Sequence, residues 1–140
     1  MNDIYQMMST LRAVRRLRPA PIPDEVLERV LQAAAWAPTG GNMQPWRVVV
    51  VRSDKRKQAL ADVYGPAWYR YAKGYDARIE QLPADEAEKA RRNRVAGDYL
   101  ADHLHEAPVI LMFVADPKMM AITDAKLDRI SMVGGGSVYT

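Results

Sequence analysis

The chain of 140 residues contains no cysteine. This absence excludes disulfides, thiolate nucleophiles and zinc sites built on cysteine, and it is compatible with a reducing compartment. Long apolar runs are also missing, since the longest, from Val109 to Ala115, is only about a third of the roughly 20 residues that a membrane-spanning helix needs. The first residues, from Met1, have no basic stretch followed by an apolar block. We therefore expect a cytoplasmic protein without a secretory signal and without membrane contact.

The excess of positive over negative charge is small, since the net charge is only +3. The positive charge is nevertheless unevenly distributed along the chain. Arg12, Arg15, Arg16 and Arg18 occur within seven residues that contain no acid. Arginine binds phosphate through paired N–H donors, and Arg12 and Arg15 are spaced to converge on one anion. The cluster predicts a local anion site, with a solvated basic face as the alternative. A nucleic-acid surface would need basic residues interleaved with aromatics, so we expect no nucleic-acid partner.

Composition and length favour a single globular domain, with 49% apolar and 26% charged residues. Apolar periodicity predicts helices over residues 3–13, 24–36, 54–63 and 84–104, and buried strands over residues 48–51 and 109–114. Asp3 is the expected cap of the first helix. The prolines at 19, 21 and 23 impose an extended path between the first two helices. Residues 119–132 are predicted to be a loop with helical turns, and residues 134–140 resemble the entry into another helix.

The segment from Pro38 to Trp46 is a loop by composition, because it holds two prolines and two glycines in nine residues. Glycine permits close backbone approach to a flat or anionic ligand, and Thr39 and Asn42 add side-chain hydrogen-bonding groups. The segment is neither GxGxxG nor GxxxxGK[ST], so neither a dinucleotide-binding fold nor a P-loop is supported. It is either a ligand-binding loop or an ordinary turn between a helix and a strand.

No catalytic residue can be assigned from spacing. His103 and His105 are two apart on a predicted helix and point in different directions, so we expect no metal site there. The serines have no partner pattern of a nucleophile, and no pair of carboxylates is marked out.

Three segments in order carry a family resemblance: residues 11–17 (LRAVRRL), 21–27 (PIPDEVL) and 35–46 (AWAPTGGNMQPW), followed by the strand at 48–51. Over about residues 5–52 they resemble the N-terminal half of the FMN-dependent nitroreductase family. Residues 101–111 and 137–139 are similar to later family segments, more loosely. The resemblance implies an α+β fold, a mixed sheet flanked by helices. It also implies a homodimer with one FMN at each of two interface sites.

The same resemblance implies roles for two groups of residues. The FMN phosphate and ribityl chain would be held by Arg12, the backbone around Ala13, Arg15 and Arg16. The flavin of the other site would be reached by Pro38, Thr39, Gly40 and Asn42. The implied chemistry is ping-pong hydride transfer from NAD(P)H to a small-molecule acceptor such as a nitroaromatic or a quinone. Because the cofactor carries that chemistry, no catalytic acid–base pair is required.

Other parts of the sequence qualify the resemblance. The aromatic region from Tyr64 to Tyr75, with Trp68 and Tyr69, corresponds to a substrate lid in some members, and an aromatic patch in the core or an interface is the alternative. Many members have Arg-Arg-Ser where this chain has Leu11-Arg12-Ala13.

The chain also stops before the family's C-terminal part, so we expect one domain over residues 1–140 that is truncated relative to the family. Incompletely covered apolar faces at 26–34 and 109–114 would then promote association. The alternative function is a non-catalytic nitroreductase-like protein that does not retain flavin.

Overall fold

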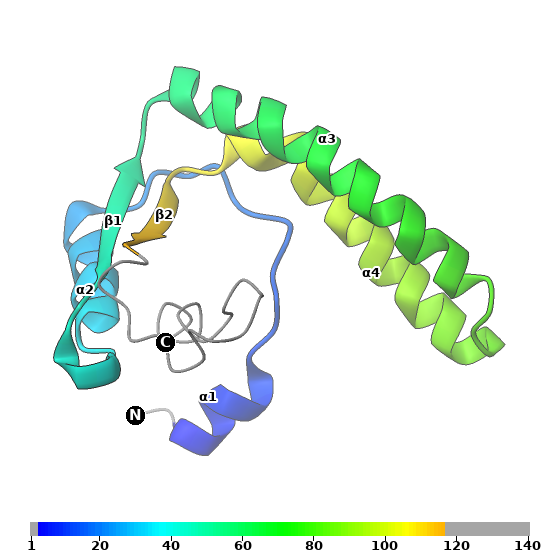
Figure 1. Cartoon of the computed structure of the whole chain (residues 1–140), viewed down its shortest axis with the longest axis horizontal. Coiled ribbons are helices and arrows are strands. Elements are labelled where there is room, and N and C mark those ends of the chain that lie inside the picture. The colour runs from blue at the N-terminus through cyan, green and yellow to red at the C-terminus, as the bar shows by residue number, and fades with distance from the viewer. Residues whose placement is uncertain (1–2, 117–140) are drawn as a thin grey trace, which may run out of the picture. The chain divides into compact units, whose positions relative to one another are not determined.

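A computed structural model describes residues 3–116, which form two compact units (Figure 1). The first unit combines residues 3–19 with 53–107, and the second combines residues 20–52 with 108–116. The described elements are helices together with a two-stranded antiparallel sheet, so the predicted α+β class is confirmed. The expectations for residues 119–132 and 134–140 lie outside the described residues. Within residues 3–116, no helix is long and apolar enough to cross a membrane.

The first unit begins with the short helix α1 (Ile4–Thr10). Asp3 caps it as expected, because its Oδ1 accepts a hydrogen bond from the backbone N–H of Tyr5 at 3.2 Å. The helix ends earlier than predicted, since Leu11 is already extended (φ −59°, ψ 130°). None of its residues is buried, and the predicted apolar stripe of Ile4, Met7, Met8 and Leu11 is 59–77% exposed. The stripe exists in the sequence but has no partner in the described part of the chain.

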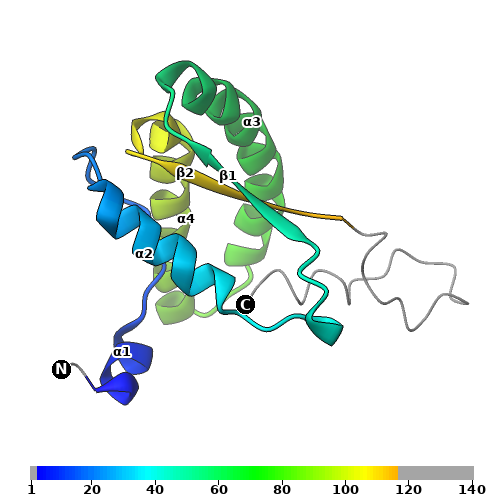
Figure 2. The same ribbon diagram turned by 90° about the vertical axis from the view of Figure 1, so that its left-hand side faces the viewer.

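The helices α3 (Asp54–Ile79) and α4 (Ala84–His103) lie side by side as a hairpin (Figures 1 and 2). Small residues are buried along the hairpin and let the two backbones approach: Ala61, Gly65 and Ala72 on α3, and Ala87, Ala90, Gly97 and Ala101 on α4. The turn end is closed by a buried apolar cluster of Ile79, Ala87 and Ala90, joined by Tyr75 and Leu82. The short 3-10 helix η2 (Leu104–Glu106) follows α4. The prediction for α4 is confirmed to within one residue.

The prediction that the preceding helix ends near residue 63 is wrong, because α3 continues through Pro66 to Ile79. A proline inside a helix removes one hydrogen bond and typically costs about 3 kcal/mol. Contacts with α4 on the far side of Pro66 offset this cost, among them the hydrogen bonds of Trp68 and Tyr69. The change to aromatic residues after position 63 therefore reflects packing against a second helix.

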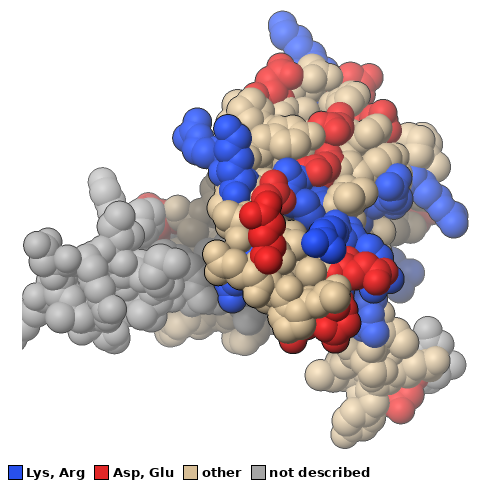
Figure 3. All heavy atoms as spheres, turned by 90° about the vertical axis from the view of Figure 1, so that its right-hand side faces the viewer, with Lys and Arg blue, Asp and Glu red and all other residues tan. Residues whose placement is uncertain are grey.

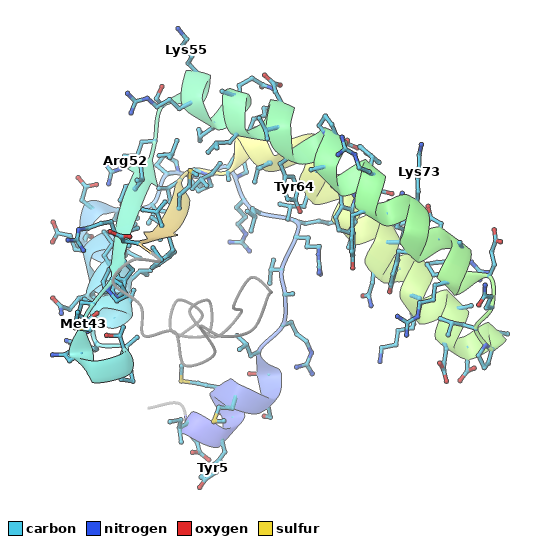
Figure 4. All side chains as sticks on the ribbon, viewed as in Figure 1. Tyr5, Met43, Arg52, Lys55, Tyr64 and Lys73 are labelled. Carbon is cyan, nitrogen blue, oxygen red and sulfur yellow. The ribbon has the colours of Figure 1, made fainter. Side chains whose placement is uncertain are left out.

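The second unit contains α2 (Asp24–Ala35), β1 (Trp46–Val51) and β2 (Ile110–Ala115). The helix matches the predicted one, and both strands occur close to their predicted positions. They pair antiparallel, with Val49 opposite Met112 (Figure 2). Arg52, which follows β1, forms an ion pair with Asp24 at the start of α2 (Figure 4).

The prediction that both strands are buried is wrong for the described residues. Each strand has only the other as its neighbour there, so each leaves one edge unpaired among the described residues. Met112, Phe113 and Val114 are 36–44% exposed, and Val26 and Val30 on α2 are 43% and 50% exposed. These are the two apolar faces that the sequence predicted to be incompletely covered.

Candidate functional site

The arginine segment, residues 11–18, leaves α1 in an extended conformation. Arg12 folds back on the end of that helix, and its Nη1 donates to the carbonyl oxygens of Ser9 at 2.9 Å and Leu11 at 2.7 Å. A guanidinium has five N–H donors, so the edge formed by Nε and Nη2 is left for another acceptor. That edge is the one that binds a phosphate or carboxylate with two parallel hydrogen bonds.

Arg15 belongs to the same segment and is half-buried. Its Nη1 donates to the carbonyl of Ala13 at 3.3 Å, which leaves most of its donors unused. Within residues 3–116, neither Arg12 nor Arg15 forms an ion pair with a carboxylate. The two side chains predicted to form a phosphate clamp are thus anchored to backbone oxygens, and no carboxylate among residues 3–116 compensates their positive charge.

Arg16 has a different environment from its neighbours. Its guanidinium carbon lies 4.0 Å from the centre of the Tyr99 ring on α4. The same ring stacks on His103, with 3.9 Å between ring centres and 9° between the planes. Of the three predicted phosphate ligands, Arg16 is therefore the one that is directed at α4.

The other predicted group of ligands lies in the second unit, on the loop between α2 and β1. The loop contains the 3-10 helix η1 (Gly40–Asn42), closed by a hydrogen bond of 2.9 Å from the backbone N–H of Asn42 to the carbonyl of Thr39. Its backbone is left-handed at Gly41 (φ 58°), Asn42 (φ 52°) and Gln44 (φ 46°). Pro38 and Gly40 are exposed. A Cβ placed on Gly40 would meet nothing within 4 Å, so this backbone faces open space.

Gln44 organises this loop, although nothing in the sequence distinguishes it beyond its place in the motif. Its backbone N–H donates to the hydroxyl of Thr39 at 3.0 Å, and its side-chain Nε2 donates to Oδ1 of Asn42 at 2.9 Å. The indole N–H of Trp46 in turn donates to its Oε1. These bonds hold Thr39 and Asn42 in place and leave the amide N–H groups of Asn42 without a protein acceptor among the described residues. In the sequence, the feature that points to this role of Gln44 is the Gln-Pro-Trp sequence at the end of the loop.

A second polar network, between α3 and α4, was not anticipated. Trp68 Nε1 donates to Asp98 at 2.8 Å, and the hydroxyl of Tyr69 donates to Asp102 at 2.7 Å. This hydrogen bond to Asp102 raises the pKa of Tyr69 above its ordinary value; burial and the Asp102 charge act in the same direction. These hydrogen bonds attach Trp68 and Tyr69 to α4. They favour the interpretation of the aromatic region as a packed patch over its interpretation as a substrate lid.

Charges on the hairpin are mixed in sign. Arg94, whose side chain is 16% exposed, forms ion pairs with Asp76 at 2.9 Å and with Asp98. Lys55 and Lys73 point away from α4 (Figure 4). On the face shown in Figure 3, basic and acidic groups alternate over α3 and α4. Within residues 3–116, no group of three or more His, Cys, Asp or Glu residues is arranged to hold a metal ion.

Comparisons with known proteins agree on one family. A family model described as "Nitroreductase family" matches residues 9–133. The chain is 47% identical over 51 residues to the NADH dehydrogenase of Thermus thermophilus, covering 36% of this chain and 25% of that protein. It is 25% identical over 124 residues to the iodotyrosine deiodinase 1 of Rattus norvegicus, covering 89% and 41%.

A third relative is a putative NADH dehydrogenase/NAD(P)H nitroreductase of Archaeoglobus fulgidus, 34% identical over 64 residues, which are 46% of this chain and 37% of that protein. The chain therefore spans less than half of the length of these relatives.

Proposed function

Because the chain belongs to the nitroreductase family, we propose that it binds FMN and acts as an NAD(P)H-dependent oxidoreductase toward a nitroaromatic, quinone or similar acceptor. The match to the family confirms the resemblance given by the three motifs, and it supports an oxidoreductase. The single observation that carries the proposal is the extent of that match. It spans residues 9–133 and so includes both the arginine segment and the loop from Thr39 to Gln44.

The donor groups of the arginine segment fit the phosphate end of FMN. A phosphate dianion needs several N–H donors and positive charge, which Arg12 and Arg15 supply from guanidinium edges that no carboxylate occupies in the described structure. The backbone around Ala13 lies between them. We assign these three residues to the phosphate and the ribityl chain.

The loop in the second unit fits the flat ring of the flavin. A heteroaromatic ring with carbonyl edges needs a backbone that it can approach closely and a few fixed hydrogen bonds. Gly40 offers open space, and the side-chain amide of Asn42 offers N–H donors in a position fixed by Gln44. Pro38 and Thr39 complete this group. FMN, when bound, would accept a hydride from NAD(P)H and supply reducing equivalents to the acceptor, whereas the protein supplies binding and orientation.

We also propose a homodimer, in which each loop reaches the flavin of the other site. Exposed apolar side chains support this part of the proposal, since contiguous apolar surface commonly marks an interface. They lie on α1, and on the groove side of α2 that Val26, Val30, Ala33 and Trp36 line.

Purification of the full chain tests the proposal directly. We expect a yellow protein, or a colourless one that becomes yellow on addition of FMN, with the flavin retained through gel filtration. Without oxygen, it should oxidise more than one equivalent of NADH or NADPH per flavin only when a nitroaromatic or quinone is present. A chain that stays colourless with excess FMN would contradict the proposal and favour the alternative, a nitroreductase-like protein without flavin. Gel filtration with light scattering gives the oligomeric state.

A second class of acceptor follows from the relatives. The alignment with the iodotyrosine deiodinase of Rattus norvegicus covers 89% of this chain, more than that with the NADH dehydrogenase. We therefore propose iodinated phenols as an alternative acceptor class. Iodide release from iodotyrosine by the FMN-loaded protein supplied with NADH or NADPH as the reductant, without turnover of nitroaromatics or quinones, would favour this acceptor. Turnover of a nitroaromatic without iodide release would exclude it.

A further inference from the structure

Three side chains form a stack between the arginine segment and α4. The guanidinium carbon of Arg16 lies 4.0 Å from the centre of the Tyr99 ring, and the His103 ring lies 3.9 Å from it in a nearly parallel plane. Two groups this close to one ring centre cannot share a face without overlapping. Arg16 and His103 therefore lie on opposite faces of Tyr99, which is held between them.

Two members of this stack, Tyr99 and His103, are held in place by α4. His103 is one helical turn beyond Tyr99, and its Nδ1 lies 2.8 Å from the carbonyl oxygen of Tyr99. Because a carbonyl only accepts hydrogen bonds, Nδ1 carries the proton, and this bond orients the imidazole. The stacked imidazole then limits the rotation of Tyr99, and the free face of the phenol ring is presented to Arg16.

The arginine segment needs such an anchor, because residues 12–18 make no backbone–backbone hydrogen bond in the described structure. Arg12 and Arg15 bond only to carbonyls at positions 9, 11 and 13, which are close in sequence. These local bonds tie the segment to the end of α1 but do not attach it to α3 or α4. The contact of Arg16 with Tyr99 joins the segment to α4, which is distant in sequence.

We propose that Tyr99 is a positioning residue for the anion site: it binds Arg16, fixes the arginine segment on α4 and so presents Arg12 and Arg15 to the phosphate. Arg16 is then an anchor and not a phosphate ligand. The inference rests on the proposed FMN site, and it divides the arginine cluster into two ligands and one support. It also gives His103 a role, as the side chain that holds the phenol ring.

The stack itself is tested in the flavin-free protein by NMR of the arginine Nε–Hε groups. A proton above an aromatic ring is shifted upfield, so we expect Hε of Arg16 to resonate upfield of the other arginines. Tyr99→Leu should abolish this shift and Tyr99→Phe should keep it, because the ring and not the hydroxyl makes the contact. An Arg16 Hε resonance at an ordinary position in the unmodified chain would overturn the proposal.

The consequence for binding is tested by FMN titration of the full chain, followed by flavin fluorescence. Tyr99→Leu and Arg16→Gln should each weaken binding by about 2–5-fold, the range of an exposed cation–π contact. The double variant should be no weaker than the weaker single variant, because both changes remove one interaction. Tyr99→Phe should bind as the unmodified chain. Arg18→Gln is the matched control for charge, since Arg18 lies in the same segment and has no ion pair or ring contact with a described residue.

The outcomes separate the two proposals. Loss of more than about tenfold in Arg16→Gln, with unchanged binding in Tyr99→Leu, would make Arg16 a direct ligand and overturn the positioning role. An upfield Arg16 signal in a chain that binds no FMN would contradict the proposed function and the ligand roles of Arg12 and Arg15, while the stack itself stands. Equal, non-additive losses that accompany loss of the upfield signal would support both.

Discussion

Arginine is used in opposite ways in two regions of this molecule. In the α3–α4 hairpin, Arg94 is largely buried, and its charge is compensated by Asp76 and Asp98. In the arginine segment, Arg12 and Arg15 bond only to backbone carbonyls and meet no carboxylate within the described residues. A guanidinium neutralised by the protein contributes to its structure, whereas one whose donors are left open has capacity for an anion from outside. We therefore expect an anion to bind at the arginine segment, whereas the hairpin contributes stability.

The largest effect is expected from a substitution in the arginine segment. Arg15→Ala should weaken FMN binding by about 1.5–3 kcal/mol, the usual contribution of a hydrogen bond to a charged group. Riboflavin, which lacks the phosphate, should bind equally to the variant and the unmodified chain. Isothermal titration with both flavins measures the difference. Unchanged FMN affinity would remove Arg15 from the site, and an equal loss for riboflavin would place it at the ribityl chain or the ring and not at the phosphate.

On the hairpin side, Gly97→Ala should cost about 1–3 kcal/mol of unfolding free energy, because the added methyl group overlaps the ring of Trp68. Gly74→Ala is the matched control, since Gly74 is also helical and a Cβ there meets nothing within 4 Å. That substitution should stabilise the chain by about 0.5–1 kcal/mol. Urea denaturation followed by circular dichroism gives both values. Equal effects of the two substitutions would contradict the close approach of α3 and α4 at Gly97.

A smaller effect is expected at Lys57, a buried cation close to the hairpin's open end. Its Nζ donates to the carbonyl of Ala107 at 2.8 Å and lies 3.0 Å from Asp54. Lys57→Met keeps the unbranched apolar stem but removes the terminal donor, and should cost about 1 kcal/mol of unfolding free energy. The exposed Lys55→Met serves as the control and should be close to neutral. A neutral Lys57→Met would show that the buried cation adds no net stability.

The smallest effect concerns Tyr69 and appears only at alkaline pH. Because its hydrogen bond to Asp102 raises the pKa of Tyr69 above the value of 10.0 expected in the unfolded chain, the ionised phenol is less favourable in the folded state. The associated stability is complete below pH 10.0 and is lost as the pH rises through the folded-state pKa. Tyr69→Phe should therefore lose less stability than the unmodified chain between about pH 9 and pH 11. Urea midpoints across that range provide the measurement, and parallel curves would contradict the effect.

Much of the fold was accessible from sequence where a local signal exists. The helix starting at Asp24 has acidic residues in its first turn and a continuous apolar stripe, and it forms over almost the predicted range. The end of α3 was not accessible, because Pro66 is a strong local stop signal and the contacts that override it come from α4, about 30 residues later in the chain. Burial of the strands was overestimated for a related reason, since a short apolar run does not say which element will cover each face.

The candidate site shows the same division. Motifs identified Arg12, Arg15, Thr39 and Asn42, because ligand-binding groups of this type recur at fixed spacing. The side chains that hold those residues in place could not be predicted from the sequence. Gln44 forms hydrogen bonds to two loop residues, and Tyr99 contacts Arg16, which is distant from it in sequence. The FMN roles of all the named residues are still predictions.

The close fit of Trp68 against Gly97 has a practical consequence. The chain has three tryptophans, of which Trp36 is 75% exposed, Trp46 begins β1, and Trp68 has its indole bonded to Asp98 in the hairpin. Replacing Trp36 and Trp46 with phenylalanine would leave a chain with one tryptophan, whose emission can be excited selectively over that of the tyrosines. The emission wavelength of Trp68 would then report on the hairpin alone. Separation of α3 and α4 could be followed by tryptophan fluorescence without a signal from a tryptophan in the other unit.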